Sequence, residues 1–211
     1  MPSYKLVYFN LRVQAEPIRY MFHLAGVDFE DKRVTEDEWK EFKSKPGLGQ
    51  LPILEVDGKE LPQSGAIYRY VAREHGFYPS SSWDRAKVDV VIETVGDFDP
   101  EMRKFFSERD PAKKTEVIKH FEEEGSVKHA NNMEKLLKEN NGGTGWFVGD
   151  KITLADVIVF YMWYDLVPSL LGIEPGTFDL KENKLLESFI KRFQSEPSIS
   201  EWLEKRPQTP F

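Results

Sequence analysis

The chain has 211 residues, of which 40% are hydrophobic and 31% are charged, values that are ordinary for a globular protein and unlike those of disordered, collagen-like or coiled-coil chains. Lysine and arginine number 29 against 36 acidic residues, and the resulting net charge of −7 opposes nucleic acid and anionic membrane surfaces as partners. The absence of cysteine excludes disulfides and thiolate metal sites, so any sulfur chemistry must use a sulfur supplied by a ligand.

The sequence carries no signal-like N-terminus and no run of about 18 consecutive apolar residues, so we expect a cytoplasmic protein that does not bind membranes. Length and composition alone are compatible with one large domain or two small ones.

The N-terminal third alternates between strand and helix patterns. Residues 4–9 are rich in strand formers and predict a buried strand. We expect a helix to follow, with Pro17 in its first turn and Gly26 as its C-terminal cap. Residues 29–34 predict a short strand, and the polar stretch around Trp39 predicts one or two helical turns.

A hairpin and a helix complete this region. The pair Asp57-Gly58 lies between two short strand-forming segments, a pattern typical of a β-hairpin. A helix is then expected from Ser64 to about His75. The order β-α-β followed by β-β-α predicts a small α/β domain over residues 1–77, and residues 76–82 have the composition of a linker.

From Trp83 onward the pattern is helical. Long amphipathic stretches occur at residues 84–108, 112–139, 153–170 and 183–195. They predict an all-helical domain over residues 84–211. Within it, Thr153 and Asp156 have the spacing of a capping box, which predicts the start of a core helix and has no role in chemistry.

Fragments along the whole chain carry a family resemblance. They are Tyr4-Lys5-Leu6-Val7-Tyr8-Phe9-Asn10 with Arg12 and Ala15-Glu16, Gly49-Gln50-Leu51-Pro52-Ile53-Leu54, Gln63-Ser64, Phe147-Val148-Gly149-Asp150 with Thr153-Leu154-Ala155-Asp156, and Arg206-Pro207-Gln208-Thr209-Pro210. Together they resemble the cytosolic glutathione S-transferases, in particular the sigma class of invertebrates, which is related to glutathione-dependent prostaglandin D synthase. The resemblance implies a thioredoxin-like domain followed by a helical domain, a homodimer, and glutathione as co-substrate without a metal.

Tyr8 is the expected catalytic residue, because the resemblance implies that its hydroxyl holds the sulfur of glutathione as a thiolate. A free thiol titrates near pH 8.5, so lowering its pKa by about two units requires about 2.7 kcal/mol of preference for the anion. One hydrogen bond to a charged group contributes about 1.5–3 kcal/mol, so one tyrosine provides most of that shift. Without the resemblance, Tyr8 reads as an ordinary half-buried strand residue.

The resemblance implies that Gln63 and Ser64 bind the γ-glutamyl carboxylate of glutathione. Backbone N–H groups at a helix start attract anions, and Ser64 is equally suited to cap the helix. The family fold further implies a cis bond between Leu51 and Pro52, with the Leu51 backbone pairing with the cysteinyl backbone of the tripeptide.

Two further contacts are expected, one at the glycyl carboxylate of glutathione and one at its α-amino group. Trp39 and Lys43 are four residues apart and share one face if this stretch is helical, where they would hold the glycyl carboxylate beside Gly49 and Gln50. The alternative is that Trp39 covers the core and Lys43 is solvated. The resemblance also implies that Asp97 reaches the α-amino group of glutathione on the partner subunit of the dimer.

The chain departs from the family pattern at two positions near Tyr8. Gln14 stands where vertebrate sigma enzymes have arginine, and Val13 replaces a glycine. The second substrate is expected to be a hydrophobic electrophile in an apolar pocket, and the expected lining residues are Phe9, Val13, Phe105 and Phe106.

Three functions remain open from the sequence. The first is a transferase that conjugates glutathione to hydrophobic electrophiles. The second is a glutathione-dependent isomerase that converts prostaglandin H2 to D2, against which Lys104 stands where that branch has an aromatic residue. The third is a non-catalytic carrier of hydrophobic ligands or a crystallin-like protein on the same fold.

Overall fold

The computed structural model describes residues 2–42 and 49–209, except the side chain of Phe42. The described chain forms two compact units. The first contains Met1–Tyr78 together with Glu196–Phe211, and the second contains Pro79–Ser195.

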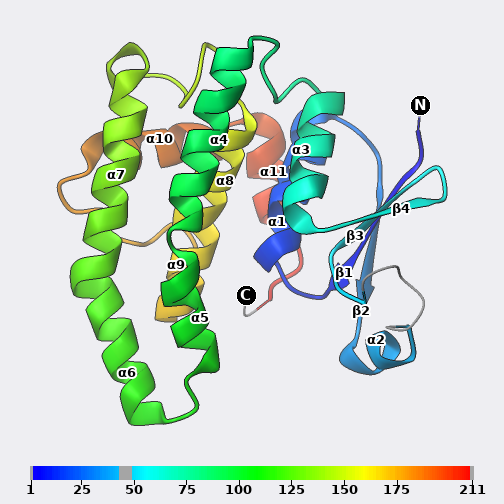
Figure 1. Ribbon diagram of the computed structural model, residues 1–211, viewed down its shortest axis with the longest axis horizontal. Coiled ribbons are helices and arrows are strands. Elements are labelled where there is room, and N and C mark those ends of the chain that lie inside the picture. The colour runs from blue at the N-terminus through cyan, green and yellow to red at the C-terminus, as the bar shows by residue number, and fades with distance from the viewer. Residues whose placement is uncertain (1, 43–48, 210–211) are drawn as a thin grey trace. The chain divides into compact units, whose positions relative to one another are not determined.

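A mixed four-stranded sheet forms the centre of the first unit (Figure 1). Its strands are β1 (Tyr4–Phe9), β2 (Glu30–Val34), β3 (Ile53–Val56) and β4 (Lys59–Pro62), in the order β2-β1-β3-β4. The β1 and β2 strands are parallel, whereas β3 is antiparallel to both β1 and β4. The predicted strands and the hairpin around Asp57 and Gly58 are therefore confirmed.

Three helices accompany the sheet: α1 (Glu16–Ala25), α2 (Glu36–Phe42) and α3 (Ser64–Glu74). The α1 and α3 helices lie side by side against one face of the sheet (Figure 1). Leu6, Ile18, Leu54 and Ile67 are fully buried in the core of this unit. Gly26 ends α1 in the left-handed conformation, with φ of 62°, as its sequence position predicts.

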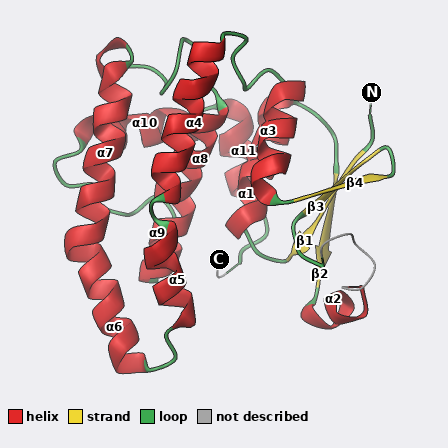
Figure 2. Ribbon diagram, viewed as in Figure 1, coloured by secondary structure: helices red, strands yellow, loops and turns green. Residues whose placement is uncertain are grey.

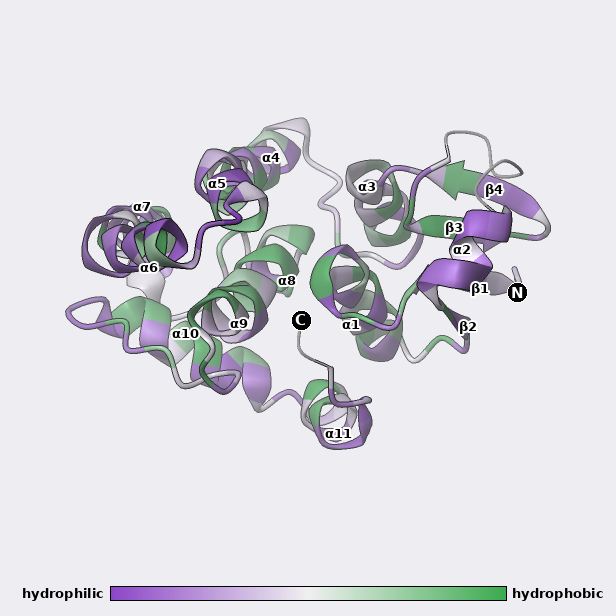
Figure 3. Cartoon of the chain, turned by 90° about the horizontal axis from the view of Figure 1, so that it is seen from below, coloured by the Kyte–Doolittle hydropathy of each residue, from purple (hydrophilic) through white to green (hydrophobic). Residues whose placement is uncertain are grey.

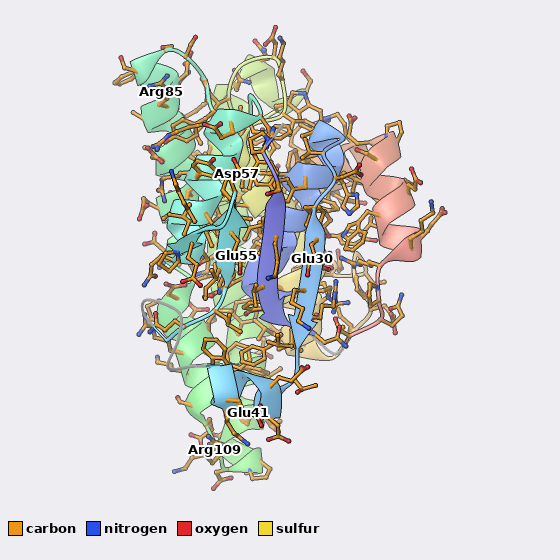
Figure 4. All side chains as sticks on the ribbon, turned by 90° about the vertical axis from the view of Figure 1, so that its right-hand side faces the viewer. Glu30, Glu41, Glu55, Asp57, Arg85 and Arg109 are labelled. Atoms are coloured by element: carbon orange, nitrogen blue, oxygen red, sulfur yellow. The ribbon has the colours of Figure 1, made fainter. Side chains whose placement is uncertain are left out.

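The opposite face of the sheet is charged. Lys5 in β1 is paired in register with Glu30 on one side and Glu55 on the other. Its ammonium nitrogen lies 3.3 Å from a Glu55 carboxylate oxygen. Figure 4 shows Glu30 and Glu55 on this face. Since charged side chains stay in water, this face remains uncovered by a helix over these positions.

The α11 helix (Pro197–Lys205) packs on α1 within the first unit. The indole of Trp202 donates a hydrogen bond of 2.8 Å to Glu16, and Arg206 donates one of 3.0 Å to the same carboxylate. His23 stacks on Trp202 with 4.3 Å between ring centroids. The sequence-based boundaries had placed this segment with the helical domain.

The second unit contains only helices and loops among its described residues (Figure 2). Its helices are α4 (Ser82–Gly96), α5 (Asp99–Ser107), α6 (Pro111–His120), α7 (Ser126–Glu139), α8 (Leu154–Phe160), α9 (Val167–Leu171) and α10 (Lys184–Gln194). Five-residue and six-residue π-helical segments continue α6 into α7 and α8 into α9. The predicted helical stretches are thus confirmed, with α4 and α5 separated at residues 97–98.

The run from Leu154 to Leu171 is the core of the second unit. It is long and apolar enough to cross a membrane, but 89% of it is buried, which identifies it as a core helix. Figure 3 shows α8 and α9 mainly in hydrophobic colours. The predicted capping box is present at its start, where Thr153 and Asp156 exchange hydrogen bonds.

Candidate functional site

The first unit contains an open cavity of ≈ 420 Å³. It is lined by Gln14, Trp39, Gly49, Gln50, Leu51, Gln63 and Ser64. Six of these seven residues were predicted as ligand contacts from the sequence, and Gln14 was noted only as a departure. Lys43 lies outside the described residues. The structure therefore brings together residues from four separate segments, in a cavity of the size that suits a small ligand.

The start of α3 forms one wall of this cavity. Gln63 precedes the helix with φ of 75°, in the left-handed region, and makes no side-chain cap. Its carbonyl accepts hydrogen bonds from Ala66 and Ile67, while the N–H groups of Ser64 and Gly65 lie in the first turn, where no helical acceptor exists. Strained backbone of this kind is enriched at ligand sites, and free N–H groups attract an anion.

Gln50 and Trp39 also line the cavity. The Gln63 side chain donates a long hydrogen bond of 3.4 Å to the Gln50 side chain. Trp39 is partly buried, and its ring meets that of Phe9 edge to face at 6.3 Å. The peptide bond between Leu51 and Pro52 is cis, as the family resemblance implies.

Tyr8 contacts Gln14, which lines the cavity. The Tyr8 side chain is buried, with 7% of its surface exposed, and its hydroxyl accepts a hydrogen bond from the backbone N–H of Gln14. Burial raises the pKa of Tyr8, although the Gln14 hydrogen bond and the charge of Arg19 oppose that change. The hydroxyl consequently keeps its proton at neutral pH and acts as a hydrogen-bond donor.

Two family models match this chain. The model described as the N-terminal domain of glutathione S-transferase matches residues 4–73, and the model of the C-terminal domain matches residues 96–206. The chain belongs to the glutathione S-transferase family. The expected fold class, a thioredoxin-like α/β domain followed by a helical domain, is confirmed by this membership and by the mixed sheet.

Individual relatives of this transferase carry three kinds of name. The chain is 38% identical to S-crystallin SL11 of Nototodarus sloanii and 36% identical to glutathione S-transferase 1 of Ascaris suum, over 100% of both chains in each case. It is also 35% identical to human hematopoietic prostaglandin D synthase, over 99% of both chains.

Solved structures of the family superpose closely. The glutathione S-transferase of Ascaris lumbricoides gives a TM-score of 0.83 at 35% identity, over 100% of both chains. A glutathione S-transferase of the hookworm Necator americanus, described as monomeric, gives a TM-score of 0.82 at 34% identity, with 99% of this chain and 100% of that chain covered.

One residue of the transferase site was missed by the sequence analysis. Tyr68 in α3 donates a hydrogen bond of 2.7 Å to the carbonyl of Gln14. Tyr68 lies one helical turn after Ser64, so the two side chains share a face. The spacing of Ser64 and Tyr68 was the only feature of the sequence that could have indicated this residue. Its hydrogen-bond partner, Gln14, is 54 positions away and could not be predicted from local pattern.

The predicted pocket residues of the transferase fall in both units. Phe9 and Val13 belong to the first unit, and Val13 has φ of 25°. Phe105 and Phe106 lie on α5 of the second unit with ring centroids 5.2 Å apart; Phe105 is buried, and Phe106 is 47% exposed. Asp97 is exposed at the C-terminal end of α4. Their roles in substrate binding stay predictions.

Metal binding was not expected for this transferase. Within residues 2–42 and 49–209, no group of three or more histidine, aspartate or glutamate side chains lies in an arrangement that holds a metal ion.

Proposed function

We propose that this glutathione transferase binds glutathione in the cavity between Gln14, Gln50 and Ser64, and that Tyr8 holds the sulfur as a thiolate for transfer to hydrophobic electrophiles. The observation that carries the proposal is the position of Tyr8. Its buried hydroxyl lies one hydrogen bond from a residue of the cavity wall. The absence of cysteine means that the sulfur must come from the ligand.

The two ends of the tripeptide are assigned to different walls. The γ-glutamyl carboxylate docks at the first turn of α3, on Gln63, Ser64 and the N–H groups there, because a helix start favours negative charge. The cysteinyl backbone pairs with Leu51, next to the cis bond to Pro52.

The glycyl end lies near the other wall of the cavity. Its carboxylate accepts a hydrogen bond from Trp39, which lines the cavity together with Gly49 and Gln50.

Thiolate stabilisation follows from the hydrogen bonds of Tyr8. A tyrosine hydroxyl has one proton to donate and two lone pairs. Because Gln14 donates to one lone pair, the hydroxyl proton is free to point at a sulfur in the cavity. One such bond to an anion contributes about 1.5–3 kcal/mol, which lowers the thiol pKa by about one to two units.

The second substrate is expected to be an apolar electrophile, and its predicted contacts are Phe9 and Val13 of the first unit and Phe105 and Phe106 of the second unit. Partly exposed aromatic side chains favour hydrophobic ligands, and Phe106 has the exposure that such a contact needs. The sulfur attacks the electrophile, and the new carbon–sulfur bond forms as the leaving group departs.

Assignment to the sigma class rests on the motifs of the sequence and on the name of the human prostaglandin D synthase relative. That relative supports the isomerase as a second activity, whereas the S-crystallin relative supports a non-catalytic role. The retained cavity favours a glutathione-dependent enzyme over the non-catalytic role, and Lys104 favours the transferase over the isomerase.

A homodimer completes the proposal. The α4 helix presents Trp83 and Val90 at 73% and 51% exposure, and an apolar surface of this kind favours a second copy of the chain. In that dimer, Asp97 reaches the α-amino group of glutathione on the partner. Sedimentation of Trp83→Glu should shift the protein toward monomer, and an unchanged dimer would place the interface elsewhere.

Turnover of a chloronitrobenzene with glutathione tests the mechanism. We expect Tyr8→Phe to lower kcat/KM by about tenfold to a hundredfold, which corresponds to the loss of one charge-assisted hydrogen bond. Activity insensitive to this change would remove Tyr8 from the mechanism. Glutathione binding without turnover of either an electrophile or prostaglandin H2 would favour the carrier.

A further inference from the structure

Two contacts connect α3 with Tyr8 through Gln14. Tyr68 donates a hydrogen bond of 2.7 Å to the Gln14 carbonyl, and the Gln14 N–H donates to the Tyr8 oxygen. Gln14 lines the cavity, so these contacts reach its wall. Of these three residues, only Tyr8 was assigned a role from the sequence.

The link between Tyr68 and Tyr8 is a strained turn. Gln14 lies in the 3-10 turn Val13–Ala15, and Val13 adopts φ of 25°. A β-branched residue at positive φ is a genuine conformational outlier that costs about 1–3 kcal/mol. Such a turn needs a tertiary contact that opposes its relaxation, and relaxation would move the Gln14 N–H away from Tyr8. Tyr68 supplies that contact from the neighbouring helix.

We propose that Tyr68 is a positioning residue, whose hydroxyl holds Gln14 in place so that the Gln14 N–H directs the Tyr8 proton toward the sulfur of glutathione. This inference rests on the proposed role of Tyr8. Tyr68 acts through Gln14 and touches neither the sulfur nor the electrophile.

The chemistry of Tyr68 suits this role. Burial raises its pKa, so the hydroxyl keeps the proton that it donates to Gln14 at neutral pH. A hydrogen bond accepted by Tyr8 polarises its O–H group and strengthens the bond that this group donates. Tyr68 thus supports thiolate formation without adding a charge to the site.

Tyr68→Phe removes the hydroxyl and keeps the ring. Tyr70→Phe is a matched control, because Tyr70 lies on the same helix and its hydroxyl interacts with Tyr4 instead of the cavity. Three quantities separate positioning from a general loss of structure: the pKa of enzyme-bound glutathione from its thiolate ultraviolet absorbance, kcat with a slow electrophile, and the Kd of glutathione.

We expect Tyr68→Phe to raise the pKa of bound glutathione by about 0.5 to 1 unit and to lower kcat at neutral pH by about threefold to tenfold, as for one lost hydrogen bond. The Kd of glutathione should change less than about twofold, because Tyr68 does not contact the ligand. Raising the pH above the new thiol pKa should restore most of kcat, and Tyr70→Phe should leave all three quantities unchanged.

The outcomes distinguish this inference from the proposal on which it depends. If Tyr8→Phe raises the thiol pKa and Tyr68→Phe does not, the positioning role is wrong and the role of Tyr8 stands. If Tyr8→Phe leaves the thiol pKa unchanged, the proposed mechanism itself fails. A lower kcat in Tyr68→Phe with an unchanged thiol pKa, or an equal effect of Tyr70→Phe, would also overturn the inference.

Discussion

At the scale of single residues, the site depends on backbone geometry as much as on side-chain chemistry. Gln63 and Val13 both have positive φ in the segments that form the cavity or adjoin it. Each conformation is strained, and it persists only because contacts with the surrounding structure offset its free-energy cost. Positive φ at Gln63 presents its amide beside Gln50 while its carbonyl still accepts the first bonds of α3.

Replacing Gln63 by alanine and by glycine separates binding from strain. Both changes remove the amide, so we expect both to weaken glutathione binding by about threefold to thirtyfold in calorimetric titration. Glycine tolerates positive φ better than alanine does, so the free energy of unfolding should be about 1 kcal/mol higher for Gln63→Gly than for Gln63→Ala. Equal free energies of unfolding for the two variants would show that the backbone at Gln63 is not strained. Unchanged affinity for glutathione would show that Gln63 does not contact the ligand.

At the scale of elements, helix starts have two different uses in this chain. The α3 helix begins without a side-chain cap, which leaves its first N–H groups for a ligand. The α8 helix begins with a complete capping box, and Asp156 there accepts hydrogen bonds from Phe147 and Thr153 at 2.7–2.8 Å. The uncapped start of α3 lines the cavity, whereas the capped start of α8 holds the core of the second unit.

The carboxylate of Asp156 is fully buried, so its removal leaves buried donors without acceptors. We expect Asp156→Ala to lower the free energy of unfolding by about 3–5 kcal/mol in urea titration, since each orphaned donor costs about 1–3 kcal/mol. Asp150→Ala is the control, because Asp150 is exposed and near in sequence. Normal stability together with lost glutathione affinity would show that Asp156 serves the ligand.

At the scale of the whole molecule, the chain closes on itself by returning its last helix to the first unit. Glu16 is fully buried and accepts hydrogen bonds from Arg19, Trp202 and Arg206. Arg206 also donates to the Tyr20 hydroxyl at 2.9 Å. The stability of the α/β unit therefore depends on residues nearly 200 positions away in the sequence.

Arg206→Met tests this dependence. Removing one member of a buried ion pair costs about 3–5 kcal/mol, because the remaining charge loses its compensation. We expect a loss of this size in the free energy of unfolding and faster proteolysis at the C-terminus, with Lys205→Met at the exposed neighbour as control. Equal behaviour of the two variants would mean that α11 contributes little to the unit.

One buried histidine, His129, and two half-buried ones, His23 and His75, make stability dependent on pH. Burial lowers the pKa of His23, His75 and His129 below the ordinary value of 6.5, although nearby carboxylates such as Glu16 and Glu101 oppose this. At these three histidines the unfolded chain therefore binds more protons below pH 6.5 than the native chain does, and their contribution to stability is lost as the pH falls from there through the native pKa values.

We expect His129→Gln to reduce the free energy of unfolding that the protein loses through its histidines between about pH 7.5 and pH 5.5. Asp156, whose pKa burial raises to about 6, acts in the opposite direction over this range, and it does so equally in both proteins. His129 is 1% exposed, whereas His120 is on the surface, so His120→Gln serves as control. A pH dependence that His129→Gln leaves intact would assign the effect to other groups.

The sequence by itself determined the local structure and most of the cavity residues. Strand patterns, the cap at Gly26, the Asp57-Gly58 turn and the box at Thr153 all act over a few residues, so a single stretch of chain specifies them. The family motifs added Gln50 and Ser64, which the structure places on one cavity.

Only the tertiary structure decided which distant residues meet. The contact of Tyr68 with Gln14 spans 54 positions, and that of Arg206 with Glu16 spans 190. Neither leaves a periodic or capping pattern, because each depends on how helices and turns pack after they form. For that reason the positioning of Tyr8 and the return of α11 to the first unit were beyond the reach of local pattern.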